Sequence, residues 1–259
     1  MKEEHKKLTE LAAFAGQIML ESHAESYRVE DTVRRILQTS GLSVTEVISN
    51  TTGLFITLDD DDPTVESITL VRRITHRGNH LNKIYRVNNI SRQLTSGTIT
   101  VDEAMEKLSI VNESEYKMLD IDLATLLMVV AFTIMLGGNV WEVLISLIAG
   151  VFVALNRIWQ SSFGMNEFFA GTMTTMFSAL IITTLLHYLP YQLNSDIIII
   201  SGLMPIYPGT AFTNGIRDTL KGDYNSGLAR ITDAFVIALS LAIGVAIGLY
   251  FSGGIIRWI

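Results

Sequence analysis

The second half of the chain contains five long apolar stretches separated by short polar connections. They cover approximately residues 119–136, 140–155, 167–186, 196–221 and 229–251. A helix needs about 20 apolar residues to cross the ~30 Å hydrocarbon core of a bilayer. The pattern therefore predicts an α-helical polytopic membrane protein with about five transmembrane helices, and it excludes an ordinary water-soluble fold for this half.

Charged residues are concentrated in the first part of the chain. Counted along the sequence, residues 1–118 hold 14 of the 19 Lys and Arg and 18 of the 26 Asp and Glu, which leaves 5 and 8 for residues 119–259. We therefore expect a polar domain over 1–118 and a transmembrane domain over 119–259. The mean hydropathy of +0.36 also lies toward the membrane class.

Composition and motifs exclude several kinds of chemistry. A formal net charge of −7 argues against nucleic-acid binding, and the absence of cysteine removes disulfides and thiolate ligands. The mixed-charge start MKEEHKKLTELAAF is not a signal peptide. His76 and His80 have helical zinc spacing but enclose a glycine, and the four aspartates at 59–62 lack the calcium-loop pattern. With no H-E-x-x-H or G-x-S-x-G motif either, we expect no metal, no cofactor and no enzyme.

The polar domain shows the periodicities of an α+β unit. The spacing of apolar residues predicts helices around 8–19 and 29–37, strands at 42–49, 53–58 and 67–74, and a helix over 79–96. Gly41 and Gly97 follow the second and third of these helices and are predicted to end them. Thr100 and Glu103 form a T-x-x-E capping box, which predicts a short helix ending near residue 108.

The fourth apolar stretch is interrupted by proline and glycine. Pro205 and Pro208 each remove a backbone donor, and Gly209 follows directly. The polar residues after the break recur on one helical face: Thr210, Thr213, Asn214, Arg217, Asp218 and Lys221. A broken helix with a polar stripe at membrane depth usually lines a cavity that satisfies its backbone groups. We therefore predict the substrate-binding site here, from Pro205 to Asp218.

The segment offers groups that suit a small polar carboxylate. A helix that restarts after Pro208 presents N–H groups and a positive dipole end, which favour a carboxylate. Thr210, Thr213 and Asn214 suit an amino or hydroxyl group, and Arg217 with Asp218 could pair or gate the mouth. Because Arg217 would also suit a second carboxylate and Asp218 an ammonium, the stripe does not choose between substrates. The alternative is a proline-kinked helix whose polar face packs on other helices or on the polar domain.

The distribution of basic residues predicts the orientation. Arg157 follows the second stretch, and Arg217, Lys221 and Arg230 lie at the junction of the fourth and fifth, whereas segments 137–139 and 187–195 contain no Lys or Arg. By the positive-inside rule, the amino-terminal domain is cytoplasmic and the chain is a multi-pass protein of the cell membrane. The first two stretches are at the lower end of spanning length, so a tilted or re-entrant hairpin stays open.

Three ionisable residues near the fourth and fifth stretches are candidates for proton coupling or gating, namely Asp218, Arg230 and Asp233. Arg230 and Asp233 are also spaced as an i, i+3 ion pair near the interface, which is a simpler explanation for them.

Asparagines and glycines mark the ends and packing faces of other stretches. Asn139 and Asn156 flank the second stretch; capping is the prediction for both, and coordination is the alternative. Gly244 and Gly248 form a G-x-x-x-G step, which predicts close helix packing.

Three segments resemble the threonine/serine exporter (ThrE) family: AGQIMLESHAESYRVEDTVRRI, MLGGNVWEVLISLIAG and GLMPIYPGTAFTNGIRDTLKGDYNSGLARITDAF. They extend over most of the chain in the family's order. The chain looks most like the separate large subunit, the YjjP-like type, because it ends after five predicted spans. His23 departs from the pattern, since the family more often has glycine before Ala-Glu. In the first segment, Glu25, Arg28 and Glu30 could contact the cytoplasmic mouth or form an interhelical salt bridge.

The resemblance implies a subunit of a secondary transporter that exports small polar carboxylates, threonine and serine first. It also implies a second, smaller membrane subunit as partner. The alternative substrate is a dicarboxylate of the succinate type. A membrane-embedded enzyme and a non-transporting assembly or signalling protein are the remaining classes, and a homo-oligomer in the lipid bilayer stays open.

Overall fold

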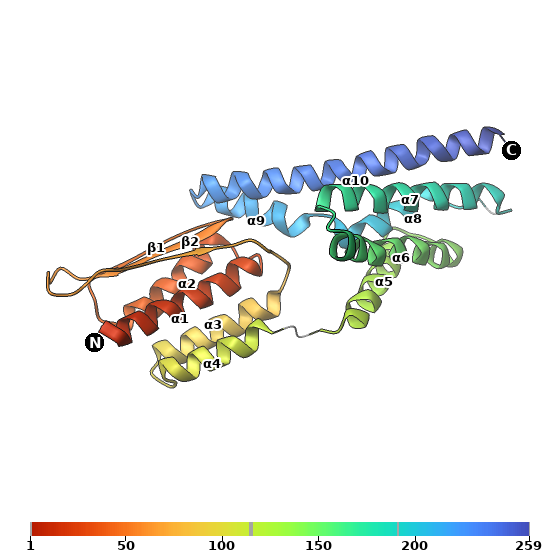
Figure 1. The fold of residues 1–259 in the computed structure, drawn as a ribbon. Helices are drawn as coiled ribbons and strands as arrows, with labels where there is room; N and C mark the ends of the chain where they lie inside the picture. The colour runs from red at the N-terminus through yellow and green to blue at the C-terminus, as the bar shows by residue number, and fades with distance from the viewer. Residues whose placement is uncertain (1, 114–115, 191, 259) are drawn as a thin grey trace. The chain divides into compact units, whose positions relative to one another are not determined.

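The computed structural model describes residues 2–113, 116–190 and 192–258, with the backbone alone for Lys2, Arg257 and Trp258. Contacts divide the chain into two compact units, each of which is described by itself (Figure 1). The first consists of Met1–Glu115 and Thr210–Thr232, and the second of Tyr116–Gly209 and Asp233–Ile259.

This division differs from the single boundary that the sequence predicts after residue 118. The first break lies three residues earlier, and Thr210–Thr232 is grouped with the amino-terminal residues rather than with the apolar helices. The physical reason is that the polar face after Pro208 has its hydrogen-bonding partners in the first unit, as the site below shows.

A three-stranded antiparallel sheet forms one layer of the first unit. Its strands, in spatial order, are β1 (Val44–Asn50), β2 (Gly53–Asp59) and β3 (Ile68–Arg73). Asn50 pairs with Gly53, so a two-residue turn joins the first two strands. Leu54, Ile56 and Leu58 alternate along β2 and are buried on the inner face of the sheet. The strands lie where the sequence predicts them.

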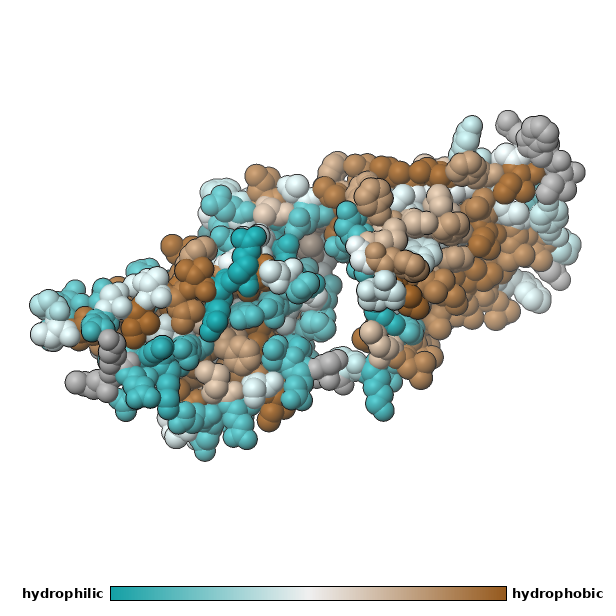
Figure 2. Space-filling model, viewed as in Figure 1, coloured by the Kyte–Doolittle hydropathy of each residue, from teal (hydrophilic) through white to brown (hydrophobic). Residues whose placement is uncertain are grey.

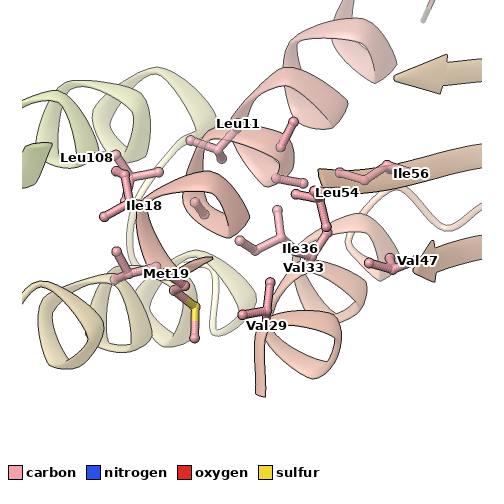
Figure 3. Packing of buried hydrophobic residues seen from close by; sticks show 14 of the residues in the cluster. Leu11, Ile18, Met19, Val29, Val33, Ile36, Val47, Leu54, Ile56 and Leu108 are labelled. Atoms are coloured by element: carbon pink, nitrogen blue, oxygen red, sulfur yellow. The ribbon is translucent and has the colours of Figure 1, made fainter. Parts of the chain in front are cut away.

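Two helices, α1 (Lys2–Glu21) and α2 (Ser26–Gln38), cover the inner face of this sheet. Two more, α3 (Leu81–Thr95) and α4 (Val101–Asn112), pack against α1. Apolar residues of these helices and of β2 form one core, in which Leu11, Leu54 and Leu108 are almost fully buried (Figure 3). Gly16 lets α1 approach closely, because a Cβ there would lie 2.5 Å from Leu54 Cδ2 and 2.7 Å from Val33 Cγ2. Truncating one of these leucines to alanine typically costs about 2–5 kcal/mol.

The predicted ends of α2 and α3 and the predicted start of α4 are confirmed, whereas α4 continues to Asn112, past its predicted end near residue 108. Gly41 and Gly97 follow α2 and α3 with φ of +77° and +72°, a region that favours glycine. Thr100 accepts a hydrogen bond from the Glu103 N–H, and the Glu103 carboxylate accepts one from the Thr100 N–H, which completes the capping box.

A helical hairpin completes the first unit. It consists of α9 (Gly209–Leu220) and the first turns of α10 (Tyr224–Trp258), joined through Gly222 at φ +90°. A Cβ on Gly215 would lie 2.8 Å from Ile231 Cγ1 and 3.0 Å from the Gly227 carbonyl oxygen. The two helices therefore pack with almost no side chain between them at this point.

The second unit is built from apolar helices. In order they are α5 (Met118–Met135), α6 (Val140–Phe163), α7 (Glu167–Tyr188), α8 (Ser195–Leu203), the 3-10 turn η1 (Met204–Ile206) and the rest of α10. Among the described residues, four helices are long and apolar enough to cross a membrane, and a broken pair over 195–220 makes up to five. Hydrophobic side chains make up most of the visible surface of this unit (Figure 2). The prediction of a mostly helical polytopic membrane protein is confirmed at this level.

The predicted break in the fourth apolar stretch is confirmed. The helix α8 ends at Leu203, Pro205 lies in the 3-10 turn, and Pro208 immediately precedes α9. Proline supplies no N–H and clashes with the preceding turn, so one continuous helix cannot form here.

The second helix of this unit is longer than predicted. It continues eight residues past the expected end at 155, and Arg157 donates two hydrogen bonds of 2.7 and 2.8 Å to the Asp122 carboxylate of α5. Because its charge is paired, Arg157 does not end the helix. Asn139 caps α6 as predicted, but the prediction that Asn156 is a cap is wrong, since Asn156 lies inside α6 and is buried.

Small residues pack α7 against α10, as the G-x-x-x-G step predicts. A Cβ on Gly244 would overlap Thr175 and the Thr172 backbone, and a Cβ on Gly248 would overlap the Met176 carbonyl oxygen. This close approach lets Thr175 Oγ1 donate a hydrogen bond to the Leu241 carbonyl oxygen at 3.1 Å.

Candidate functional site

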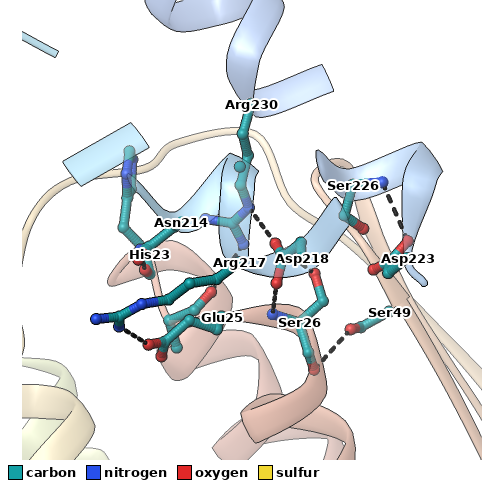
Figure 4. Close-up of polar contacts among 12 residues, drawn as sticks. His23, Glu25, Ser26, Ser49, Asn214, Arg217, Asp218, Asp223, Ser226 and Arg230 are labelled. Atoms are coloured by element: carbon teal, nitrogen blue, oxygen red, sulfur yellow. Dashed lines mark hydrogen bonds and ion pairs between the residues drawn. The ribbon is translucent and has the colours of Figure 1, made fainter. Parts of the chain in front are cut away.

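The polar face of α9 meets the loop between α1 and α2 inside the first unit (Figure 4). Four side chains, those of Asn214, Arg217, Asp218 and Arg230, contact residues 23–26. We call this set of contacts the clasp. It joins segments about 190 residues apart in the sequence.

Asp218 caps the amino terminus of α2. Its Oδ1 accepts a hydrogen bond from the Ser26 N–H at 3.2 Å, and its Oδ2 lies 3.4 Å from Ser26 Oγ. The residue at the helix's own N-cap position, Glu25, makes no capping hydrogen bond with its side chain. A carboxylate at this position also interacts favourably with the positive end of the helix dipole.

Arg230 neutralises Asp218. Its Nε lies 3.0 Å from Asp218 Oδ2, and its Nη2 donates a 2.7 Å hydrogen bond to the Ala24 carbonyl oxygen. Asp218 and Arg230 are only 1% and 4% exposed. Removing one member of a buried ion pair typically costs about 3–5 kcal/mol, because the other charge stays buried without compensation.

Glu25 binds two arginines at the edge of the clasp. Its Oε1 accepts a hydrogen bond from Arg217 at 2.8 Å and its Oε2 accepts one from Arg28 at 3.1 Å. Burial alone would raise the pKa of this carboxyl. The hydrogen bonds from its own backbone N–H, Arg217 and Arg28 outweigh burial, so the pKa of Glu25 is lowered below its ordinary value of 4.5.

The turn before α2 has a backbone conformation that favours glycine. His23 has φ +63°, in the left-handed region, and its carbonyl oxygen accepts a 2.9 Å hydrogen bond from Asn214 Nδ2. The strained position is therefore held by a bond from α9.

The remaining predicted site residues are distributed over both units. Thr210 Oγ1 donates to Asn79 Oδ1 at 2.9 Å, and Thr213 is exposed. Pro205, Pro208 and Gly209 belong to the second unit, as does the exposed Asp233. Thus the structure brings together Asn214, Arg217, Asp218 and Arg230, whereas Asp233 is not part of the clasp.

The partners of these side chains are largely backbone groups of the α1–α2 loop. The carbonyls of His23 and Ala24 and the N–H of Ser26 carry no signature in the sequence, so residue types alone could not identify them. The one available signal was Glu25 in the family-like first segment.

The described residues contain no candidate metal centre. Within residues 2–113, 116–190 and 192–258, no three His, Cys, Asp or Glu side chains are grouped closely enough to hold a metal ion.

The apolar helices of the second unit indicate the class of protein. Four apolar helices of spanning length and a fifth, broken one are the architecture of an integral membrane protein, and a proline-broken span is typical of transporters. Residues 10–252 match the family model ThrE, described as "Putative threonine/serine exporter". The chain therefore belongs to this family of membrane exporters, as its sequence segments predict.

Two relatives of this chain differ from each other in length and in the function that their names give. The chain is 23% identical to the "Probable threonine/serine exporter" of Mycobacterium tuberculosis over 94% of its own length, but it spans only 46% of that protein. It is 22% identical to the "Probable succinate transporter subunit YjjP" of Klebsiella aerogenes, with 96% of this chain and 95% of that protein covered. No solved structure matches the chain.

Proposed function

We propose that this chain is a subunit of a secondary transporter that exports small polar carboxylates, with threonine and serine as the first candidates. The observation that carries the proposal is the break between α8 and α9 in a fourth apolar segment. An interrupted helix leaves backbone groups that a binding site can use, and its restarting end favours a carboxylate. The chain belongs to a family of exporters, which supports export as the direction of transport.

The residues around the break divide into two roles in this proposal. Pro205 and Pro208 set the break, and Gly209, Thr210 and Thr213 form the restarting helix end that binds the substrate carboxylate.

The clasp is the gate in this proposal. Asn214, Arg217, Asp218 and Arg230 hold α9 and α10 on the α1–α2 loop, so breaking these bonds would free α9 to move. Gating changes transport rate rather than substrate specificity, which makes the two roles separable by experiment.

Membrane placement and partner follow from the same proposal. The chain is placed in the cell membrane with its amino-terminal unit in the cytoplasm, because the arginines lie in the connections on that side. A second, smaller membrane subunit is the proposed partner. The word "subunit" in the name of the Klebsiella aerogenes relative, which this chain covers almost completely, supports it.

A dicarboxylate is the second candidate substrate. The relative named as a succinate transporter subunit matches this chain over nearly its whole length, whereas the threonine/serine exporter is about twice as long. Arg217, whose side chain is 62% exposed, is a cation that could bind a second carboxylate.

Proton coupling is assigned to two carboxylates, Asp218 in the gate and Asp233 in α10, with Arg230 as the partner of Asp218. An imposed pH gradient across vesicles should change the export rate. A rate indifferent to that gradient would remove this part of the proposal.

The experiment is an efflux assay on cells or vesicles with the full chain, with and without the small subunit, loaded in turn with threonine, serine and succinate. Asn214→Ala and Asp218→Asn should reduce export in proteins that still insert. The matched control is Asn225→Ala, an exposed amide at the start of α10 outside the clasp. Wild-type export by both clasp variants would contradict the gate, and no export of any carboxylate with both subunits would favour the assembly or signalling alternative.

A further inference from the structure

Three polar oxygen atoms are buried in the second unit without a hydrogen-bond partner among the described residues. Two of them belong to residues that are themselves buried, namely Oδ1 of Asn156, which is 8% exposed, and Oγ1 of Thr174, which is 1% exposed. The third is Oγ1 of the half-buried Thr183. Other buried hydroxyls nearby are paired, as between Thr133 and Ser201 at 2.8 Å. An unpaired polar group in a dry interior costs free energy, so two such atoms in one bundle call for a function.

The two residues lie at the same level of neighbouring helices. Gly164–Asn166 connect α6 to α7, and Asn156 lies seven residues before the end of α6 while Thr174 lies seven residues after the start of α7. At ~1.5 Å per residue, each is about 10 Å from the connection.

Asn156 and Thr174 also lie on the buried faces of α6 and α7. Ala149 of α6 and Ile182 of α7 belong to one buried cluster. Asn156 lies seven residues, or two turns, beyond Ala149, and Thr174 lies eight residues before Ile182. Both residues therefore lie on the buried sides of neighbouring helices, at the same distance from the connection.

The break in the fourth apolar segment begins near this part of α6. The start of α8 is beside the start of α6, since the Asn194 N–H donates to Glu142 Oε1 at 2.7 Å. Farther along, a Cβ on Gly202 would overlap the Ala149 side chain, so the two helices run in the same direction. Because α8 ends at Leu203, the break begins just beyond this contact, in the direction in which α6 continues to Asn156.

The chemistry of the two atoms selects a hydrogen-bond donor. An amide oxygen only accepts hydrogen bonds, and a threonine hydroxyl can accept as well as donate. The charge of the adjacent cation, Arg157, is already balanced within the bundle by two hydrogen bonds to Asp122. In the clasp, Asp218 is already satisfied by Arg230 and Ser26, so it does not need an ammonium group.

We infer that Asn156 and Thr174 form a buried acceptor site for the ammonium group of a small amino-acid substrate, near the helix break. The inference rests on the proposed export function and deepens it, because it favours an amino acid over a dicarboxylate. Thr183 also has an unpaired hydroxyl, but it lies nine residues beyond Thr174 on the opposite side of α7. It provides a matched control.

The test is ligand binding to the purified full-length protein, measured by thermal stabilisation with L-serine, ethanolamine and succinate as separate probes. Ethanolamine carries an ammonium and a hydroxyl but no carboxylate. L-Serine and ethanolamine should stabilise the wild type and succinate should not. Asn156→Leu and Thr174→Val should weaken L-serine binding at least about tenfold, the effect of losing a hydrogen bond to a charged group. Thr174→Ser and the control Thr183→Val should bind within about twofold of wild type.

The outcomes separate this inference from the transport proposal. Without ligand, Asn156→Leu and Thr174→Val should be at least as thermostable as wild type, because they remove unpaired polar atoms, so loss of binding is not loss of folding. Stabilisation by succinate alone, or unchanged L-serine affinity in both variants, overturns the inference even if efflux is normal. Binding as expected with no efflux of any substrate would uphold the site and contradict the transport function.

Discussion

The clasp of the first unit and the Asn156–Thr174 pair of the second are both buried polar clusters, but they are built in opposite ways. In the clasp, Asp218 has Arg230 and Ser26 as partners, and Arg230 also binds a backbone carbonyl. In the second unit, Asn156 Oδ1 and Thr174 Oγ1 have no partner among the described residues.

This difference distinguishes polar contacts that stabilise the fold, as in the clasp, from polar groups that are available to bind a ligand, as in the Asn156–Thr174 pair. A buried ion pair with further hydrogen-bonding partners holds one arrangement in place, and removing one member leaves an uncompensated charge. Unpaired buried acceptors lower stability, and they gain their hydrogen bonds only when a donor binds. Stability and binding should therefore respond to mutation in opposite ways at the two places.

The largest loss of stability is expected for Asp218→Ala. Arg230 would stay buried without its counter-ion, and α2 would lose its cap, so the free energy of unfolding should fall by about 3–5 kcal/mol. Denaturant unfolding of the full-length protein measures this. The control is the double variant Asp218→Leu/Arg230→Met, which removes both charges and should recover most of the loss. A double variant no more stable than Asp218→Ala would show that the pair itself is not the cause.

A smaller loss is expected for Glu25→Gln, about 1.5–3 kcal/mol for hydrogen bonds to a charged group. The folded-state pKa of Glu25 is lowered, so its contribution is fully present above 4.5 and is lost as the pH falls through the lower folded-state value. The stability difference between wild type and Glu25→Gln should stay constant from pH 7 to about 5.5 and shrink below pH 4.5. Its growth on acidification would contradict this assignment.

The smallest effect within the clasp is expected for Ser26→Ala. Its hydroxyl lies 3.4 Å from Asp218, whereas the shorter bond comes from the backbone N–H, which the substitution keeps. We expect a loss of only about 0.5 kcal/mol by the same unfolding measurement. A loss comparable to that of Asp218→Ala would mean that the hydroxyl, not the ion pair, organises the clasp.

The sequence was sufficient where the physical signal is local. Helix spacing, the Thr100–Glu103 capping box and the proline break after Leu203 all depend on residues a few positions apart, and the structure has them where they are predicted. Packing at Gly244 was also predictable, because only a small residue permits so close an approach.

The sequence was insufficient where the signal is tertiary. The spacing predicts that the polar residues after Pro208 share one face of a helix, and they do so on α9. Their contacts, however, are largely backbone groups of residues 23–26, which no spacing in the sequence indicates. The prediction of Asn156 as a cap is wrong because α6 continues beyond it, through Arg157, whose charge is paired with Asp122 of α5. The prediction of a substrate site at the break itself stays a prediction.

The most direct test compares Asp218→Asn with Asn156→Leu in one preparation of full-length protein, measuring unfolding without ligand and L-serine affinity together. Asp218→Asn should lose several kcal/mol of stability and keep its affinity within about twofold. Asn156→Leu should keep its stability and lose at least about tenfold in affinity. Wild-type affinity in Asn156→Leu, or a greater loss of stability there than in Asp218→Asn, would contradict the distinction between a structural clasp and a ligand site.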